Sequence, residues 1–120
     1  MFRFEKLDVW QKAVDFAHGV YGVTSRFPRE ERFGLTSQMR RAAVSISSNV
    51  AEGTGRSSDK DFAHFLGIAY GSLMEVASQL QVAFRHAWLK QKDRDDLYAR
   101  AEELARMLSG LKASLSRRSP

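Results

Sequence analysis

Three histidines, His18, His64 and His86, are the first candidates for metal chemistry in this sequence of 120 residues. None of them follows a glutamate by three residues, which is the spacing that di-iron helical bundles require. The sequence contains no cysteine, so thiolate zinc sites, iron–sulfur clusters, disulfides and cysteine nucleophiles are excluded. We therefore expect no metal site and no cofactor, and we interpret His64 as a surface or boundary residue.

A glycine-containing segment at residues 53–58, Gly-Thr-Gly-Arg-Ser-Ser, is the closest match to a phosphate-binding loop. It lacks the Gly-x-x-x-x-Gly-Lys-Ser/Thr spacing and follows a predicted helix, whereas phosphate loops follow a strand. The sequence has no Gly-x-Ser-x-Gly nucleophile motif, and no apolar row of a helix contains a pair of carboxylates. These observations predict a protein that is not an enzyme.

An excess of basic residues makes an anionic partner the main functional candidate. The 19 lysines and arginines exceed the 14 aspartates and glutamates, which gives a formal net charge of +5 and a pI of about 9.9. Such an excess favours contact with phosphate backbones, although each basic residue alone is more typical of a solvated helix face. Arg56 also precedes an expected helix, whose free N–H groups suit a phosphate. The candidate phosphate-binding residues are Arg40, Arg41, Arg56, Lys60, Lys90, Lys92, Arg94, Arg117 and Arg118.

Four segments with apolar residues at alternating spacings of three and four must position these side chains. The expected helices span about 8–27, 36–52, 58–88 and 93–116, followed by a frayed basic tail at 116–120. No segment alternates with a period of two, and short connections join antiparallel neighbours. The sequence therefore predicts an all-α fold: one domain over residues 1–120, built as an antiparallel up-down-up-down four-helix bundle.

Local signals suggest where these helices begin and end. Phe27 precedes a proline, which favours the end of the first helix there. Thr36 is the expected N-cap of the second helix, and Gly53 and Gly55 are expected to close it. In the third helix the apolar row runs without a polar exception as far as Ala87.

Polar residues on the second and third helices need an explanation. Residues 33–50 include Arg40 and Arg41 but no acidic residue, and their serines favour close helix contact within the chain or at a subunit interface. Asn49 falls on the apolar row, where it fixes the register or bonds a neighbouring backbone group. Glu75 has no basic residue one turn away, so it is either exposed or paired with Arg40 or Arg41.

The sequence gives no sign of a membrane or export segment. Its first eight residues include several charges and lack the apolar core of a secretory signal. The longest apolar-rich stretch, residues 65–74, is much shorter than the roughly 20 residues that a spanning helix needs. We expect a cytoplasmic protein with no membrane contact.

The stretch GLTSQMRRAAVSISSNVAEGTGR at residues 34–56 resembles the signature of the 23S rRNA-intervening sequence protein family, also called S23 ribosomal proteins. The segments LDVWQKAVDFAHGVYGVTSRFP (7–28) and FLGIAYGSLMEVASQL (65–80) are similar to that family as well. The resemblance covers residues 4 to about 115. It implies a small bacterial bundle protein that assembles into ring-shaped pentamers and has no established catalytic activity. It also implies a relation to the accessory subunit of diversity-generating retroelements, which binds a reverse transcriptase and nucleic acid.

Two functions remain open at this point. The first is a basic homo-oligomer that binds RNA or DNA independently of base sequence, since five copies would carry roughly +25 and no sequence-reading motif is present. The alternative is a scaffold or accessory subunit that binds another protein and has no direct nucleic-acid role. Trp88, beside Lys90 and Lys92, is the aromatic residue that lies off the apolar rows and is the candidate for stacking on bases.

Overall fold

The computed structural model describes residues 1–118 of the chain and contains four α-helices. They are α1 (Asp8–Thr24), α2 (Leu35–Thr54), α3 (Asp59–Arg85) and α4 (Gln91–Arg118), with short 3-10 turns at Arg3–Lys6 and Arg29–Glu31. No strand occurs in this part of the chain. The prediction of an all-α fold with four helices is confirmed.

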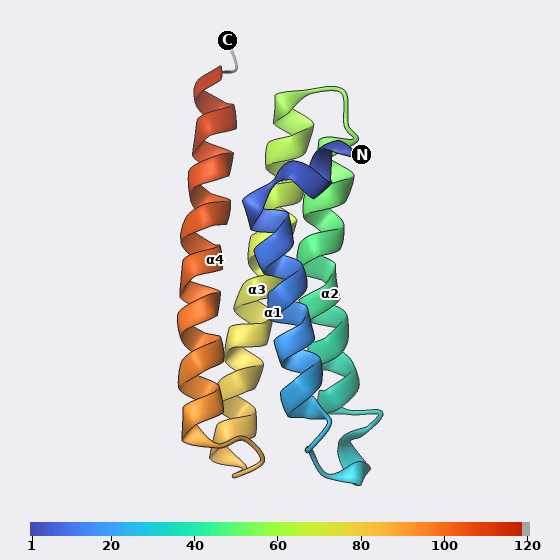
Figure 1. Cartoon of the computed structure of the whole chain (residues 1–120), viewed down its shortest axis with the longest axis vertical. Coiled ribbons are helices and arrows are strands. Elements are labelled where there is room, and N and C mark those ends of the chain that lie inside the picture. The colour runs from blue at the N-terminus through green and yellow to red at the C-terminus, as the bar shows by residue number, and fades with distance from the viewer. Residues whose placement is uncertain (119–120) are drawn as a thin grey trace.

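The helices lie side by side along an axis of 49 Å, and the other two dimensions are 22 and 21 Å. Figure 1 shows the chain reversing its direction at each connection from α1 to α4. Among the described residues, α1 packs on α2, α2 on α3, α3 on α4, and α4 returns to α1, so the four helices form a closed square around one core. The connections 25–34 and 86–90 meet at one end, where the rings of Phe27 and Trp88 lie 6.1 Å apart. We call this the loop end, and the opposite end, which holds the connection 55–58, the terminal end.

The core is formed by the apolar rows that the three-four spacing predicts. Because such residues share one face of a helix, they can all be buried against neighbouring helices. Each Å² of apolar surface removed from water contributes about 25 cal/mol to folding. Phe16 of α1, Ile46 of α2 and Leu104 of α4 contribute fully buried side chains. In α3 the buried row consists of Phe62, Leu66, Ala69, Leu73, Val76, Leu80 and Ala83.

The third helix ends before Ala87, which adopts a left-handed backbone with φ of 61°. The N–H of Trp88 donates to the Ala83 carbonyl at 3.0 Å, and the N–H of Ala87 donates to the Phe84 carbonyl at 2.9 Å. This pair of hydrogen bonds closes a helix around a left-handed residue. Ala87 is therefore exposed and not part of the core row, contrary to the prediction, and Leu89 is buried instead.

The first helix also ends before the predicted position. Its last residue is Thr24, whose hydroxyl donates to the Val20 carbonyl at 2.7 Å. The N–H of Phe27 then bonds the Thr24 carbonyl at 3.1 Å in a tight turn. Phe27 is still buried, so its apolar side chain belongs to the core although its backbone has left the helix.

The second helix differs from the prediction at both ends. Its N-cap is Gly34, without a side-chain cap, and Thr36 lies inside the helix with a buried side chain. At the other end the helix continues through Gly53, where an added Cβ would lie only 2.7 Å from Cδ1 of Phe62. Gly55 has a φ of −86°, so neither glycine supplies a left-handed backbone. Gly53 is required instead by the close approach of α3.

The fourth helix continues to Arg118 and does not fray from residue 116 as predicted. The guanidinium of Arg118 donates to both carboxylate oxygens of Asp59, at 3.0 and 2.8 Å. This bidentate pair connects the last turn of α4 to the first turn of α3. Residues 119 and 120 of the predicted tail lie outside the described residues.

Candidate nucleic-acid interface

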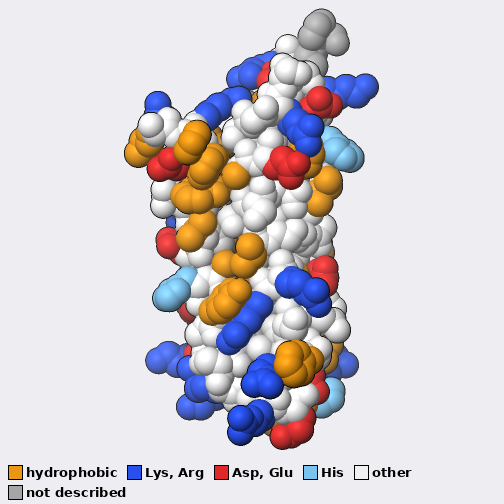
Figure 2. All heavy atoms as spheres, turned by 90° about the vertical axis from the view of Figure 1, so that its right-hand side faces the viewer, with side chains coloured by type: hydrophobic (Ala, Val, Ile, Leu, Met, Phe, Trp, Pro, Cys, Tyr) orange, Lys and Arg blue, Asp and Glu red, His pale blue; other side chains and the backbone are white. Residues whose placement is uncertain are grey.

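The structure distributes the predicted phosphate-binding residues over both ends of the bundle and does not bring them onto one surface. Figure 2 shows basic side chains mainly near the two ends of the visible face and more sparsely across its middle. By element, they are Arg40 and Arg41 on α2, Lys90, Lys92 and Arg94 at the loop end, and Arg56, Lys60, Arg117 and Arg118 at the terminal end.

At the terminal end, the two arginines nearest to the start of α3 are paired with acidic side chains. Arg56 binds Glu52 at 2.9 Å and lies over the Phe65 ring, 4.6 Å from its centroid. Arg118 is paired with Asp59. Ser58 caps the α3 N-terminus by accepting the N–H of residue 61, and two aspartates lie in the first turn. Neither of these two arginines is therefore free to bind a phosphate at this helix start.

Of the predicted residues at the terminal end, Lys60 and Arg117 remain exposed and unpaired among the described residues. They lie on α3 and α4 respectively. Their charges are available to a phosphate, but both are close in sequence to the Asp59–Arg118 ion pair.

The loop end also carries exposed cations without acidic partners. Lys90 and Lys92 are exposed and form no ion pair within residues 1–118. Arg94 is less accessible, because it binds Asp95 and lies over the Phe84 ring, 4.0 Å from its centroid. Lys90 and Lys92 are thus the candidate residues that the structure leaves most accessible at this end.

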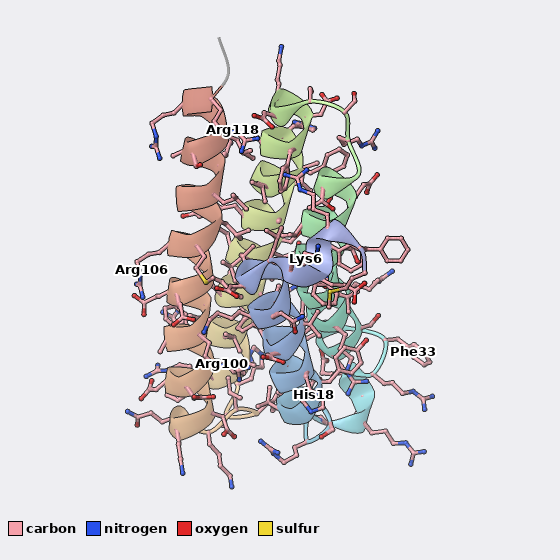
Figure 3. The ribbon with its side chains drawn as sticks, turned by 45° about the horizontal axis from the view of Figure 1, so that its top comes forward. Lys6, His18, Phe33, Arg100, Arg106 and Arg118 are labelled. Carbon is pink, nitrogen blue, oxygen red and sulfur yellow. The ribbon has the colours of Figure 1, made fainter. Side chains whose placement is uncertain are left out.

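Sequence reasoning missed Arg29, Arg32 and Phe33 in the connection between α1 and α2. Both arginines are exposed and lack an acidic partner in the described part of the chain. Phe33 is 85% exposed and lies against Arg32, whose guanidinium carbon is 4.7 Å from the ring centroid. Figure 3 shows Phe33 on the outside of this connection. The available signal was an aromatic residue isolated in a polar segment, outside every apolar row.

A hollow of about 270 Å³ lies between the end of α1, the 25–34 connection and the start of α2. We call it the arginine hollow, because three arginines line it and no aspartate or glutamate does. Its polar lining consists of Thr24, Ser25, Arg29, Arg32, Thr36 and Arg40.

Trp88 is not the free stacking residue that the sequence predicts. Its ring is half-buried and packs against Phe27, and it also lies 4.5 Å from the His86 ring. Since a stacking aromatic needs a face that is open to a base, the exposed Phe33 is the better placed ring at the loop end.

The polar residues between α2 and α3 form a short network. The amide nitrogen of Asn49 donates to the carbonyl and the hydroxyl of Ser45, at 2.8 and 2.9 Å. The Ser45 hydroxyl lies 3.0 Å from the Ser72 hydroxyl on α3. Of the two roles predicted for Asn49, the structure shows the bond to a neighbouring backbone group.

Glu75 is exposed and forms no ion pair with Arg40 or Arg41. It accepts a hydrogen bond from Gln79 on its own helix at 3.3 Å, and the other amide atom of Gln79, Oε1, is buried without a partner in the described residues. Glu75 and Arg41 line the same shallow hollow between α2 and α3.

The histidines lie apart on the outside of the bundle. His18 is on α1, His64 on α3 and His86 just after α3, and all three are exposed. Within residues 1–118 no three histidine, aspartate or glutamate side chains form a group that could hold a metal ion. None of the described helices is both long and apolar enough to cross a membrane.

The fold places the chain in the class of all-helical bundles. Within residues 1–118, one end of this bundle carries unpaired arginines and an exposed aromatic ring. The chain belongs to the 23S rRNA-intervening sequence protein family, whose model matches residues 5–110. Its fold is similar to the crystal structure of a protein with unknown function from the S23 ribosomal protein family of Bacteroides thetaiotaomicron, with a TM-score of 0.80. The two chains are 22% identical, and the match covers 87% of this chain and 97% of that one. A comparison with curated proteins gave no match.

Proposed function

We propose that this protein is not an enzyme and that it binds RNA or DNA through the phosphate backbone, independently of base sequence. The observation that supports this proposal is the loop end, where exposed cations without acidic partners in the described residues lie at the same end as an exposed aromatic ring. Guanidinium and ammonium groups bind phosphates, and an open ring stacks on any base. The cations are Arg29, Arg32, Lys90 and Lys92, and the ring is Phe33.

Salt dependence of binding tests the phosphate contacts at the loop end. The Lys90→Gln/Lys92→Gln variant removes two exposed, unpaired charges there. Each phosphate contact contributes about −0.7 to −0.9 to the log–log slope of affinity against salt, so the slope should become shallower by about 1.4 to 1.8. The matched control, Lys60→Gln/Arg117→Gln, removes the same charge at the terminal end and should change the slope much less. Filter binding of a short RNA at several salt concentrations measures both.

Two outcomes of this experiment would contradict the proposal. Equal changes in slope for the two variants would place the phosphate contacts over the whole molecule and not at the loop end. Failure of the unaltered protein to bind either RNA or DNA at about 50 mM salt would reject nucleic-acid binding, since electrostatic contacts are strongest at low salt. The scaffold function described below would then be favoured.

Phe33→Ala tests the stacking part of the proposal. Base–aromatic stacking contributes about 1–3 kcal/mol for each base, so affinity for single-stranded RNA should fall at least fivefold. Affinity for a duplex of the same length should stay unchanged, because its bases are already stacked. Equal loss for both substrates would show that Phe33 does not stack on a base.

We also propose that the chain functions as a ring-shaped homo-oligomer, with the pentamer expected from the family. Beside the Ser45–Ser72 contact between α2 and α3, Val44 and Ile68 expose apolar surface within one turn, and the one charge of each sign in the adjoining hollow comes from Arg41 and Glu75. Five copies would carry roughly +25 and would attract phosphates more strongly than one. Light scattering at micromolar concentration should give about five times 13.6 kDa. A strictly monomeric mass would remove this part of the proposal.

A protein-binding scaffold in the cytoplasm is the second candidate. Several apolar side chains of α3 are about two-fifths exposed, among them Ile68, Met74 and Val82. Apolar surface of this kind suits a protein partner when no second copy covers it. Retained binding of a protein partner by a chain that binds no nucleic acid would favour this function.

A further inference from the structure

We propose that the arginine hollow is a binding site for a single phosphoryl group. The proposal does not depend on the nucleic-acid function, because a free phosphate ion and a phosphate of a nucleic acid present the same oxygens to the site. The hollow lies beside the connection from α1 to α2, which Figure 1 shows at the lower end of the bundle.

The first argument is charge. Arg29, Arg32 and Arg40 line the hollow, and no carboxylate lines it. Glu31 of the same connection does not line the hollow, and its Oε1 accepts the N–H of Leu35 at 3.0 Å. Guanidinium groups bind phosphate oxygens with paired, charge-assisted hydrogen bonds. Three of them around one hollow favour an anion with several acceptor oxygens.

The second argument is the fixed position of Arg40. Its Nε donates to the Thr24 hydroxyl at 2.9 Å, and its guanidinium carbon lies 4.6 Å from the centroid of the Tyr21 ring. Both contacts hold the side chain, while the two terminal nitrogens have no acceptor within residues 1–118. An arginine that is already immobilised loses less conformational entropy when it binds a ligand.

The third argument is Thr36. This residue is only 7% exposed, and its hydroxyl has no hydrogen-bond partner among the described residues. It lines the hollow at the start of α2. The N–H groups of Thr36 and Ser37 also have no acceptor there, and the first turn contains no acidic residue. The positive end of α2 therefore adds to the three arginines.

The size of the hollow limits the ligand. Its volume of about 270 Å³ is close to the lower limit of about 300 Å³ for pockets that take small molecules. One phosphoryl group with ordered water fits this volume, whereas the rest of a dinucleotide or a larger cofactor would extend beyond it.

Binding of inorganic phosphate tests the site directly. We expect saturable binding of phosphate to the full chain, followed by ³¹P NMR at constant ionic strength with chloride as the balancing anion. Arg29→Gln/Arg32→Gln should weaken this binding at least tenfold, because two charge-assisted contacts are lost. The matched control, Arg41→Gln/Arg85→Gln, removes two exposed arginines that do not line the hollow and should change the affinity less than twofold.

Thr36→Val separates the hydroxyl from the charge. The side chains of threonine and valine have similar shape, so helicity should be retained while the affinity for phosphate falls severalfold. Absence of saturable phosphate binding by the unaltered chain would overturn the proposal. Equal weakening by the control variant would overturn it as well, because it would show a general effect of charge.

A competition experiment identifies the source of the phosphoryl group. Displacement of bound phosphate by a short single-stranded RNA would show that an RNA phosphate occupies the hollow. Retained phosphate in the presence of bound RNA would make the free ion the ligand, and both results keep the site. Phosphate binding by a chain that binds no nucleic acid would reject the proposed function while supporting the hollow.

Discussion

Arg40 of α2 donates a hydrogen bond from its Nε to the hydroxyl of Thr24 on α1, over 2.9 Å. Thr24 is 2% exposed, and the same hydroxyl donates to the Val20 carbonyl at 2.7 Å. Arg40 therefore connects the last turn of α1 to α2, and it also lies over the Tyr21 ring. Arg40 thus faces α1 and forms no ion pair with Glu75, which is exposed on α3.

Arg40→Ala should destabilise the chain by about 1–2 kcal/mol, because it removes a hydrogen bond of a charged donor and a cation–π contact. Arg41→Ala is the matched control, since Arg41 is exposed and has no partner among the described residues. It should stay within about 0.5 kcal/mol of the unaltered chain. Urea unfolding at one fixed protein concentration measures both, and equal midpoints for the two variants would contradict the role of Arg40.

Ala87→Gly should stabilise the chain by about 1 kcal/mol. Ala87 has a φ of 61°, where the Cβ atom of an L-residue crowds the backbone and glycine does not. For a chain of this length the thermal midpoint should rise by about 3–5 °C. A lower midpoint would show that the greater freedom of glycine in the unfolded chain outweighs the relief of strain.

Gly53→Ala should destabilise the chain by about 1–3 kcal/mol, because the new Cβ would lie 2.7 Å from Cδ1 of Phe62 and 3.1 Å from Cβ of Phe65. Gly71→Ala is the control on α3, where nothing lies within 4 Å of an added Cβ. It should stabilise the helix by about 0.5–1 kcal/mol. If both variants unfold at the same midpoint, the close approach of α2 and α3 at Gly53 does not exclude a larger side chain there.

Glu103→Gln should reduce stability at neutral pH and have no effect in strong acid. The hydrogen bond from Lys12 and the attraction of its charge lower the pKa of Glu103 below 4.5, and the two side chains are 2.6 Å apart. A lowered folded-state pKa contributes stability above pH 4.5, and this contribution disappears as the pH falls through the folded value. The effect is small, because both side chains are about half exposed.

The alkaline side of the same pair has the opposite sign. The hydrogen bond to Glu103, followed by its charge, raises the pKa of Lys12 above 10.5. The contribution is complete below pH 10.5 and is lost as the pH rises through the higher folded value. The free energies of unfolding of the unaltered chain and the Glu103→Gln variant should therefore differ most between pH 4.5 and pH 10.5. A difference that persists at pH 2 would have another cause.

The helices and the core could be predicted from the sequence because both depend on local periodicity. A residue's membership of an apolar row is set by spacings of three and four within one helix. The row of α3 from Phe62 to Ala83 was therefore correct without knowledge of its neighbours. Helix ends were predicted less well. Ala87 takes a left-handed backbone at the end of α3, and an alanine in the sequence does not indicate such a backbone.

The site depended on the tertiary structure. The arginine hollow combines Thr24, Arg29, Arg32, Thr36 and Arg40, which belong to two helices and their connection. Spacing along one helix does not show which cations lie close to carboxylates on another. Arg56 and Arg118 were expected to be free, but each is paired with an acidic residue.

The amino-acid sequence by itself determined the four helices, their apolar faces and the basic excess, because each is a property of composition or of neighbours within one turn. Only the tertiary structure decided which charges remain unpaired. The energy of a charged side chain depends on groups that lie within a few ångströms in space and far apart in sequence. Arg118 and Asp59 are 59 positions apart and bind at 2.8 Å, while Lys90 and Lys92, close to several aspartates in sequence, remain exposed and unpaired within residues 1–118.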